Sequence, residues 1–232
     1  MELSELLMNF KLSRQEARIY LSLTINGEMT GYEVAKQTAI SRSTIYTALA
    51  SLVEKGAAYL IEDKATRYTA IPIDEFCTNQ IRAMEKIKNT LIENMPKKQV
   101  DTEGYITIKG HKNILDKIRN MINEANQRIY ISLAKKTIET IMPNLKEALS
   151  KGLKIVIITN PPFNLSGATI YHNEKKEKTI RIITDSSKVL TGDIIYGINS
   201  SCLYSKKQNL VDLFKESLKN EIKIIELSKS RK

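Results

Sequence analysis

Side chains that can hydrogen-bond to nucleic acid gather in the short segment from residue 41 to residue 55. The apolar residues of this segment follow the i, i+4, i+7, i+8 spacing of one buried helix face: Ile45, Leu49, Leu52 and Val53. The same spacing turns Ser43 and Thr47 outward and places Tyr46 on the flank and Arg42 in the first turn. Hydroxyls can approach base edges in a DNA groove, and an arginine can contact guanine with two hydrogen bonds. The pattern therefore predicts a helix that reads DNA.

Basic residues on either side of this helix are of the kind that bind phosphate groups. Residues 57–71 contain two runs of strand formers around a charged turn at Asp63-Lys64, which predicts a β-hairpin wing carrying Lys64 and Arg67. Phosphate contacts set the register of a protein on DNA without reading its sequence. The predicted DNA-binding residues are Lys36, Arg42, Ser43, Thr44, Tyr46, Thr47, Lys55, Lys64 and Arg67.

Three helices must position these side chains. Ser13 with Glu16 and Thr30 with Glu33 have the spacing of two capping boxes, in which a hydroxyl and a carboxylate satisfy the free N–H groups at a helix start. A third helix begins after Ser41 and ends before residue 56, a glycine, which tolerates the left-handed conformation past a helix end. Three short helices followed by a strand pair predict a winged helix-turn-helix over residues 1–72.

Composition describes an ordinary folded protein. The chain has 232 residues, enough for two domains, with 42% hydrophobic and 27% charged residues. It has no apolar stretch of the roughly 20 residues that a membrane span needs, and its N-terminus lacks the basic start of a secretory signal, so we expect no membrane partner and a cytoplasmic location. Cys77 and Cys202 are too few for a disulfide framework or a zinc site, and we expect no metal and no cofactor.

The net charge of +10 is unevenly distributed. Residues 1–70 contain eight basic and eight acidic residues, so the predicted DNA-binding unit is neutral overall. Residues 101–232 contain 23 Lys and Arg against 14 Asp and Glu, an excess of 9. The DNA interpretation therefore depends on the placement of the charges rather than on their sum. The C-terminal excess is consistent with either a solvated surface or a second electrostatic contact with DNA.

A long helix is predicted after the wing, within a linker of residues 73–97. Asp74 can cap it and Pro96 ends it. Its apolar residues are spaced three or four apart, close to a heptad seam: Cys77, Ile81, Met84, Ile87, Leu91 and Met95. We expect this helix to join two protomers of a homodimer. The alternative is that the same stripe packs onto domains of its own chain.

A different pattern begins at residue 103, after a polar and charged boundary segment. Strands are expected at 105–108, 128–133, 153–159, 169–172, 180–184, 189–191, 194–203 and 223–227, and helices at 112–125, 137–150 and 208–219. Strands that alternate with helices imply crossover connections and a mostly parallel sheet. The predicted fold class is α+β with two domains, a winged helix-turn-helix and a linker helix followed by an α/β domain over 103–232.

Both halves resemble one family. The segment Leu12-Ser13-Arg14-Gln15-Glu16-Ala17-Arg18-Ile19-Tyr20 and the segment Ser41-Arg42-Ser43-Thr44-Ile45-Tyr46 are similar to motifs of the TrmB family of transcriptional regulators. The segment 180–185 and the hairpin that follows it are similar to a strand pair of phospholipase D enzymes. The resemblance implies a winged helix-turn-helix, a helical linker and a phospholipase-D-like sensor domain.

The resemblance also implies where catalytic residues would lie. Phospholipase D enzymes use a His-x-Lys-x-x-x-x-Asp motif, whose histidine attacks phosphorus. When the motif is aligned on Asp185, Lys178 stands at the histidine position and Ile180 at the lysine position. His111 and His172 are the two histidines of the chain, and neither is followed by a lysine two residues later. We therefore expect that the domain has no catalytic residues and has kept the fold of these enzymes but lost their activity.

The leading hypothesis is a homodimeric, sequence-specific regulator that binds double-stranded DNA, with a non-enzymatic C-terminal domain for effector sensing or dimerisation. The loop 160–167 follows the most hydrophobic strand, where α/β sheets bind ligands, and either lines an effector pocket or is an ordinary surface loop. Two alternatives stay open. The winged helix could bind a protein of the transcription machinery, as its neutral charge would allow, or the C-terminal domain could retain phosphodiester hydrolysis.

Overall fold

The computed structural model describes residues 2–96, 104–160, 162–173, 179–194 and 200–229. Contacts between Cα atoms divide the chain into two compact units, Met1–Lys98 and Gln99–Lys232. The predicted domain limits at residues 97 and 103 lie outside the described residues. No helix in the described part of the chain is both long and apolar enough to cross a membrane.

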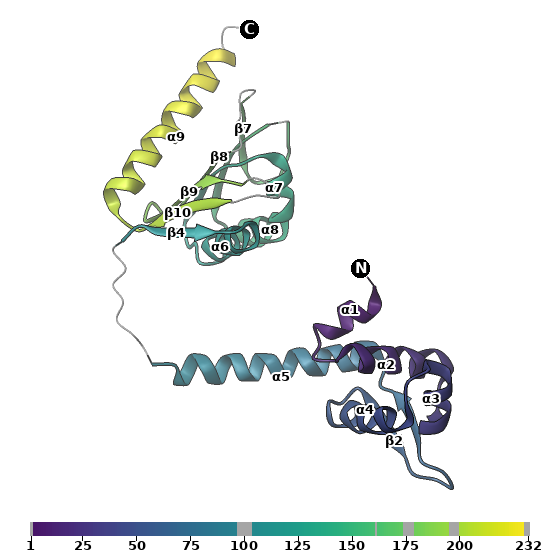
Figure 1. Cartoon of the computed structure of the whole chain (residues 1–232). Coiled ribbons are helices and arrows are strands. Elements are labelled where there is room, and N and C mark those ends of the chain that lie inside the picture. The colour runs from purple at the N-terminus through teal and green to yellow at the C-terminus, as the bar shows by residue number, and fades with distance from the viewer. Residues whose placement is uncertain (1, 97–103, 161, 174–178, 195–199, 230–232) are drawn as a thin grey trace. The chain divides into compact units, whose positions relative to one another are not determined.

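The first unit is a winged helix-turn-helix (Figure 1). Its elements are α1 (Leu3–Met8), α2 (Arg14–Asn26), β1 (Met29–Thr30), α3 (Gly31–Thr38), α4 (Arg42–Glu54), β2 (Ala58–Ile61), β3 (Arg67–Ala70) and α5 (Ile73–Asn94). The three strands form an antiparallel sheet in the order β1-β3-β2. The predicted winged helix-turn-helix is confirmed, with α1 as an additional helix.

Local capping determines where α2 and α3 begin. Ser13 Oγ accepts a hydrogen bond from the backbone N–H of Glu16 at 3.2 Å, and the Glu16 carboxylate accepts one from the Ser13 N–H at 2.6 Å. Thr30 and Glu33 exchange the same two bonds at 3.3 and 2.7 Å. Both predicted capping boxes are therefore confirmed. Behind them a single core forms, which includes Ile19, Tyr20, Leu23, Ile45, Leu49, Leu52 and Phe76.

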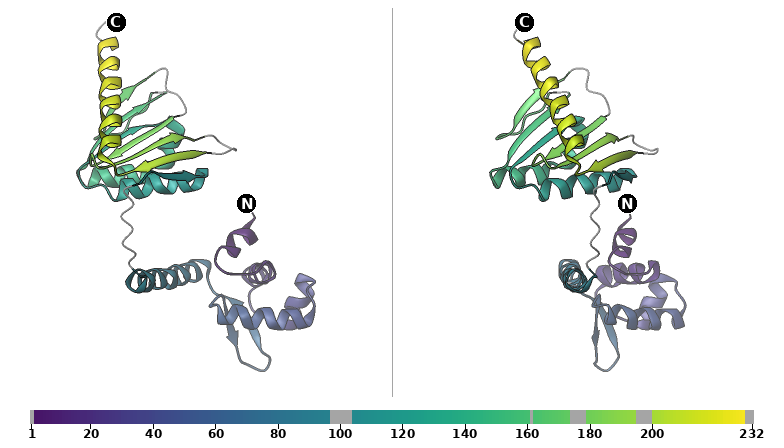
Figure 2. Two further views of the ribbon diagram at one scale, coloured as in Figure 1. Left: turned by 60° about the vertical axis from the view of Figure 1, so that its left-hand side comes forward. Right: turned by 90° about the vertical axis from the view of Figure 1, so that its left-hand side faces the viewer.

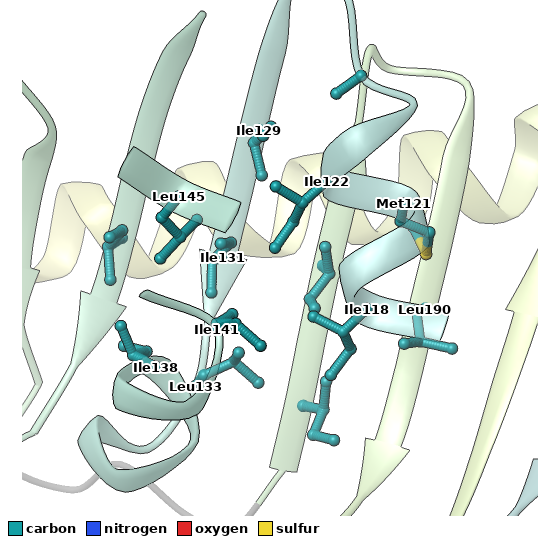
Figure 3. Packing of buried hydrophobic residues seen from close by; sticks show 14 of the residues in the cluster. Ile118, Met121, Ile122, Ile129, Ile131, Leu133, Ile138, Ile141, Leu145 and Leu190 are labelled. Carbon is teal, nitrogen blue, oxygen red and sulfur yellow. The ribbon is translucent and has the colours of Figure 1, made fainter. Parts of the chain in front are cut away.

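The second unit is a seven-stranded sheet between two helical layers (Figure 2). Its elements are β4 (Ile106–Lys109), α6 (His111–Asn123), β5 (Arg128–Ser132), α7 (Lys135–Thr140), α8 (Met142–Ser150), β6 (Lys154–Thr159), β7 (Thr169–His172), β8 (Thr179–Thr184), β9 (Lys188–Asp193), β10 (Ser201–Ser205) and α9 (Gln208–Lys229). The strand order is β4-β10-β9-β8-β5-β6-β7. Residues of α6, α7 and α8 pack on one face, around Ile118, Ile131 and Leu145 (Figure 3), and α9 covers the other.

The expectation of a mostly parallel sheet is wrong. Strands β5, β6 and β7 are parallel, as the alternating strand–helix pattern predicts. The four other junctions are antiparallel. Strands β8 and β9 are joined by a tight turn in which Asp185 and Ser186 both have left-handed φ angles, 50° and 52°. Such a short connection can join only antiparallel strands.

Two further expectations are corrected. The predicted helix at 137–150 is two helices, because Pro143 lacks an N–H and restricts the residue before it, and the backbone turns at Ile141. The predicted strand at 223–227 is the last part of α9. Leu218, Ile222 and Ile225 stand at i, i+4 and i+7 and pack against the sheet, which keeps this stretch helical. Of the strand predicted at 194–203, residues 195–199 lie outside the described residues.

Candidate nucleic-acid interface

The turn between α3 and α4 fixes the angle at which α4 is presented. Ala39 adopts a left-handed conformation with φ 55°, which ends α3 and reverses the chain. The Arg18 guanidinium donates a hydrogen bond to the Thr38 carbonyl at 2.9 Å, so α2 satisfies a free carbonyl at the end of α3. The Thr38 hydroxyl donates to the Val34 carbonyl at 2.7 Å. The turn is thus held by contacts from within the helix-turn-helix.

The exposed face of α4 carries the residues that the sequence predicts. Ser41 Oγ accepts a hydrogen bond from the Thr44 backbone N–H at 3.4 Å and lies 2.8 Å from the Thr44 hydroxyl. Thr44 is half-buried, and its hydroxyl is engaged in the helix cap. Arg42, Ser43 and Thr47 are exposed. The Thr47 hydroxyl donates to the Ser43 carbonyl at 3.2 Å, a local bond that leaves its oxygen free to accept. The face is small and polar, as entry into a DNA groove requires.

Two contacts between α3 and α4 orient the largest side chains of this face. The Arg42 guanidinium carbon lies 4.6 Å from the centroid of the Tyr32 ring, in a cation–π contact. The ring of Tyr46 lies against Gly31, where a Cβ atom would stand 2.6 Å from Tyr46 Cε1. Tyr32 was not predicted as a site residue, because its part in the site depends on the packing of α3 against α4.

The wing and α3 contribute exposed cations. Lys64 lies in the loop between β2 and β3, Arg67 begins β3, and Lys36 lies in the last turn of α3. Arg67 pairs with Thr30 in the sheet and therefore lies beside the first turn of α3. The pKa of Glu33 is lowered chiefly by its hydrogen bond from the Thr30 backbone, and Arg67 lowers it as well. Lys36, Lys64 and Arg67 remain exposed and open to a phosphate.

Lys55 stands apart from the other predicted residues. Its Nζ lies 2.6 Å from a carboxylate oxygen of Glu16, on α2, and its backbone carbonyl accepts a hydrogen bond from Gln80 at 2.9 Å. Burial alone would raise the pKa of Glu16, but hydrogen bonds from Lys55, Ser51 and Ser13 outweigh it and lower the pKa to about 2. The Lys55 ammonium is thus engaged in a structural ion pair that links α2 to the end of α4.

The predicted loss of catalytic residues concerns the second unit. His111 begins α6 and His172 ends β7, so the two histidines lie on different elements. His172 Nδ1 is buried with no hydrogen-bond partner among the described residues. Ile180, at the position of the family's lysine, belongs to the apolar core, and Lys178 lies outside the described residues. The described residues contain no group of three His, Cys, Asp or Glu side chains that could hold a metal ion.

The loop 160–167 contributes side chains to the core. Leu165 is buried in the cluster under α6, α7 and α8, and Phe163 packs against it. The Lys135 ammonium lies 3.5 Å from the Pro162 carbonyl. Pro161 lies outside the described residues. In its described part the loop therefore packs Phe163 and Leu165 inward, and its role in ligand binding stays a prediction.

The first unit is thus a winged helix-turn-helix that presents a polar helix and a wing carrying Lys64 and Arg67, a fold that many DNA-binding modules share. Two sequence profiles of one family match the chain. "Sugar-specific transcriptional regulator TrmB" matches residues 6–74, and "Transcriptional regulator TrmB, EBD N-terminal subdomain" matches residues 104–216. The chain belongs to the TrmB family of DNA-binding transcriptional regulators.

Relatives from bacteria and archaea resemble most of the chain. It is 26% identical to the uncharacterized protein YrhO of Bacillus subtilis, over 98% of this chain and 87% of YrhO. It is 27% identical to the DNA-binding HTH-type transcriptional repressor TrmBL2 of Thermococcus kodakarensis, over 73% of this chain and 72% of that protein.

Solved structures with partial similarity include a structure of TrmBL2, described as an archaeal chromatin protein. It has a TM-score of 0.49 and 20% identity, and the match covers 95% of this chain and 97% of that one. Nuc of Salmonella typhimurium, a phospholipase D family member, has a TM-score of 0.42 and 14% identity, over 50% of this chain and 92% of Nuc.

Proposed function

We propose that this chain is a homodimeric regulator that recognises a specific DNA sequence through α4. The observation that carries the proposal is the polar, exposed face of α4, which Ser41 caps and which Tyr32 and Gly31 of α3 support. Membership of the TrmB family supports DNA binding in general.

Each residue of the interface takes a role from its position. Arg42 is the side chain able to make a bidentate contact with guanine, and its stacking on Tyr32 restricts the guanidinium before DNA arrives. Ser43 and Thr47 approach base edges beside it. The phosphate contacts fall to Lys36, Tyr46, Lys64 and Arg67, which are exposed around α4. Thr44 and Lys55 support the interface from within, through the helix cap and the Glu16 ion pair.

Dimerisation is assigned to the exposed stripe of α5. Phe76 is buried in the first unit's core, so α5 is anchored at its start. Beyond this anchor, large apolar side chains on one helix face are about half exposed or more: Ile81, Met84, Ile87, Leu91 and Met95. Near the start of this stripe, Phe10, Ile81 and Met84 line an apolar groove of about 460 Å³. A contiguous exposed patch of this kind is typical of an interface, and a second copy of α5 would present the same stripe in two-fold symmetry.

Selection of bound fragments from sheared genomic DNA tests sequence recognition. We expect a roughly palindromic motif whose affinity falls steeply with salt, because phosphate contacts release counterions. Arg42→Ala should cost about 1–3 kcal/mol on the selected site and relax preference at one base pair, whereas Lys64→Ala should weaken specific and random DNA alike. Equal losses on both DNAs for both variants would contradict these roles. Weak binding that does not respond to salt would favour a protein partner for the winged helix.

Sedimentation of the full chain tests the dimer. Ile87→Asp places a charge in the proposed seam and should raise the dimer dissociation constant by about a hundredfold or more. Asn89→Asp makes the same charge on the other side of α5 and is the matched control, with no expected change. If both variants sediment as the unaltered protein does, the seam lies elsewhere.

The second unit is proposed to be non-enzymatic and to serve in effector sensing or dimerisation. The buried Ile180 at the position of the family's lysine supports this assignment, because its side chain cannot stabilise an oxyanion. A phosphodiesterase assay with a chromogenic diester should show no turnover by the full chain. Turnover that His172→Ala abolishes would overturn the assignment.

A further inference from the structure

Three lysines of the second unit lie near one another beside the buried Tyr204. Tyr204 lies on β10 and is 5% exposed. The Lys117 ammonium of α6 lies 3.8 Å from the centroid of its ring. Lys188 begins β9, and Lys206 follows the last residue of β10. The cluster is distant in the sequence from every residue assigned to DNA reading.

The register of β9 and β10 places Lys188 and Lys206 close to each other. Tyr204 pairs with Leu190, and both belong to the core cluster under α6. Lys188 precedes Leu190 by two residues on β9, so its side chain projects toward α6. Lys206 follows directly after β10, and its charge acts on Lys117 and Glu124 of α6. In the antiparallel pairing of β10 and β9, Ser205 stands opposite Val189. Extending the pairing by one residue brings Lys206 opposite Lys188, at the start of β9. Two like charges in such positions repel each other.

The acidic side chains nearby compensate this charge only in part. Glu124 of α6 pairs with Lys188, with its oxygen 2.8 Å from the ammonium. Asp185 is already engaged, because its carboxylate accepts hydrogen bonds of 2.9 to 3.0 Å from the backbone N–H groups of residues 126, 127 and 128. Burial lowers the pKa of Lys117, and the neighbouring Lys188 and Lys206 also lower it, whereas Glu124 opposes them. Of the two carboxylates near these three ammonium groups, Glu124 is paired with Lys188 and Asp185 accepts backbone hydrogen bonds, so the charge of the lysines is only partly compensated.

We propose that Lys117, Lys188 and Lys206 form a binding site for a phosphate group. A phosphate supplies up to two negative charges and several acceptor oxygens, which can bridge three ammonium groups and remove their repulsion. Lysine is a common ligand of phosphate groups, to which it contributes a point charge and up to three hydrogen-bond donors. The phosphate can belong to a small phosphorylated ligand or to the DNA backbone. The site stands independently of α4 and of the proposed dimer.

Calorimetric titration of the full chain with inorganic phosphate at low ionic strength tests the site. A charge-assisted hydrogen bond contributes enough that Lys117→Gln and Lys206→Gln should each weaken binding about tenfold. Lys146→Gln, on the exposed side of α8, removes the same charge elsewhere and should leave binding unchanged. Lys206 is exposed, so its variant tests the site even if Lys117→Gln disturbs folding.

Titration with a short duplex of random sequence identifies the source of the phosphate. If it is the DNA backbone, the Lys117 and Lys206 variants lose duplex affinity, and the salt slope falls by about 1 for each lysine removed. If it is a small ligand, only the binding of inorganic phosphate is lost. A selective loss with either probe supports the site. The proposal is overturned if neither probe binds in a way that depends on these lysines, or if Lys146→Gln has the same effect. Arg42→Ala leaves inorganic phosphate binding intact, so a failure of the DNA-reading proposal is distinguishable.

Discussion

Replacing Glu16 with glutamine should lower the free energy of unfolding of the first unit by about 2–3 kcal/mol. Glu16 is 5% exposed, and its carboxylate lies 2.6 Å from Lys55 Nζ. Glutamine keeps the shape of the side chain and can still accept the hydrogen bond from the Ser13 N–H, so the variant removes mainly the charge. Loss of one partner of a fully buried ion pair costs about 3–5 kcal/mol. Because the Lys55 side chain is 33% exposed, we expect a value at or below the lower end of that range.

The lowered pKa of Glu16 is consistent with this magnitude. The fall from its ordinary value of 4.5 to about 2 corresponds to roughly 3 kcal/mol at neutral pH, as an upper limit. Because the folded-state pKa lies below the unfolded one, this stabilisation is complete above about pH 4.5 and is lost as pH falls toward about 2. The unaltered protein should therefore lose more stability than Glu16→Gln over this interval.

Urea unfolding followed by pulsed hydrogen exchange and mass spectrometry measures the effect, because peptides from residues 14–54 report on the first unit alone. Glu33→Gln is the matched control. It changes the same position of the other capping box, where Glu33 is exposed and forms no ion pair with a lysine of the described residues, and it should cost less than about 1 kcal/mol. Equal losses for the two variants, or a Glu16→Gln variant with unchanged acid sensitivity, would refute the assigned role of the ion pair.

Two glycines supply further predictions. Gly31→Ala should destabilise the first unit by about 1–2 kcal/mol, because the new Cβ would lie 2.6 Å from Tyr46 Cε1. The loss should shrink in a Tyr46→Ser background, and a double-mutant cycle of urea unfolding that is strictly additive would contradict this contact. Gly192→Ala should cost more than about 3 kcal/mol in the second unit, because its Cβ would meet the Ser201 carbonyl and stand 2.6 Å from Cys202 Cα. Gly152→Ala meets only open space at φ 80° and should cost about 1 kcal/mol. Comparable losses of stability for Gly192→Ala and Gly152→Ala would contradict a backbone clash at Gly192.

Much of the first unit could be predicted because its signals are local. A capping box lies within four residues, so the starts of α2 and α3 follow from Ser13 and Thr30 alone. The outward face of α4 follows from the spacing of its apolar residues, and the wing from two short runs of strand formers. In each of these cases the residues that determine an element also belong to it.

The strand order of the second unit could not be predicted in the same way. The pattern of strand and helix identifies the parallel strands β5, β6 and β7, but β4 follows the linker and pairs with β10 at the opposite edge. The stretch 223–227 has the composition of a strand, yet it is helical because Ile222 and Ile225 meet the sheet when α9 continues. Packing overrides local propensity where both conformations are available.

The sequence by itself determined the class of the DNA-binding unit, its helix starts and the residues that face outward from α4. Only the tertiary structure decided what those residues contact. It placed Tyr32 under Arg42, joined Lys55 to Glu16 across 39 positions, and brought Lys117 against the ring of Tyr204. Such contacts depend on how distant elements pack, and local spacing carries no information about that packing.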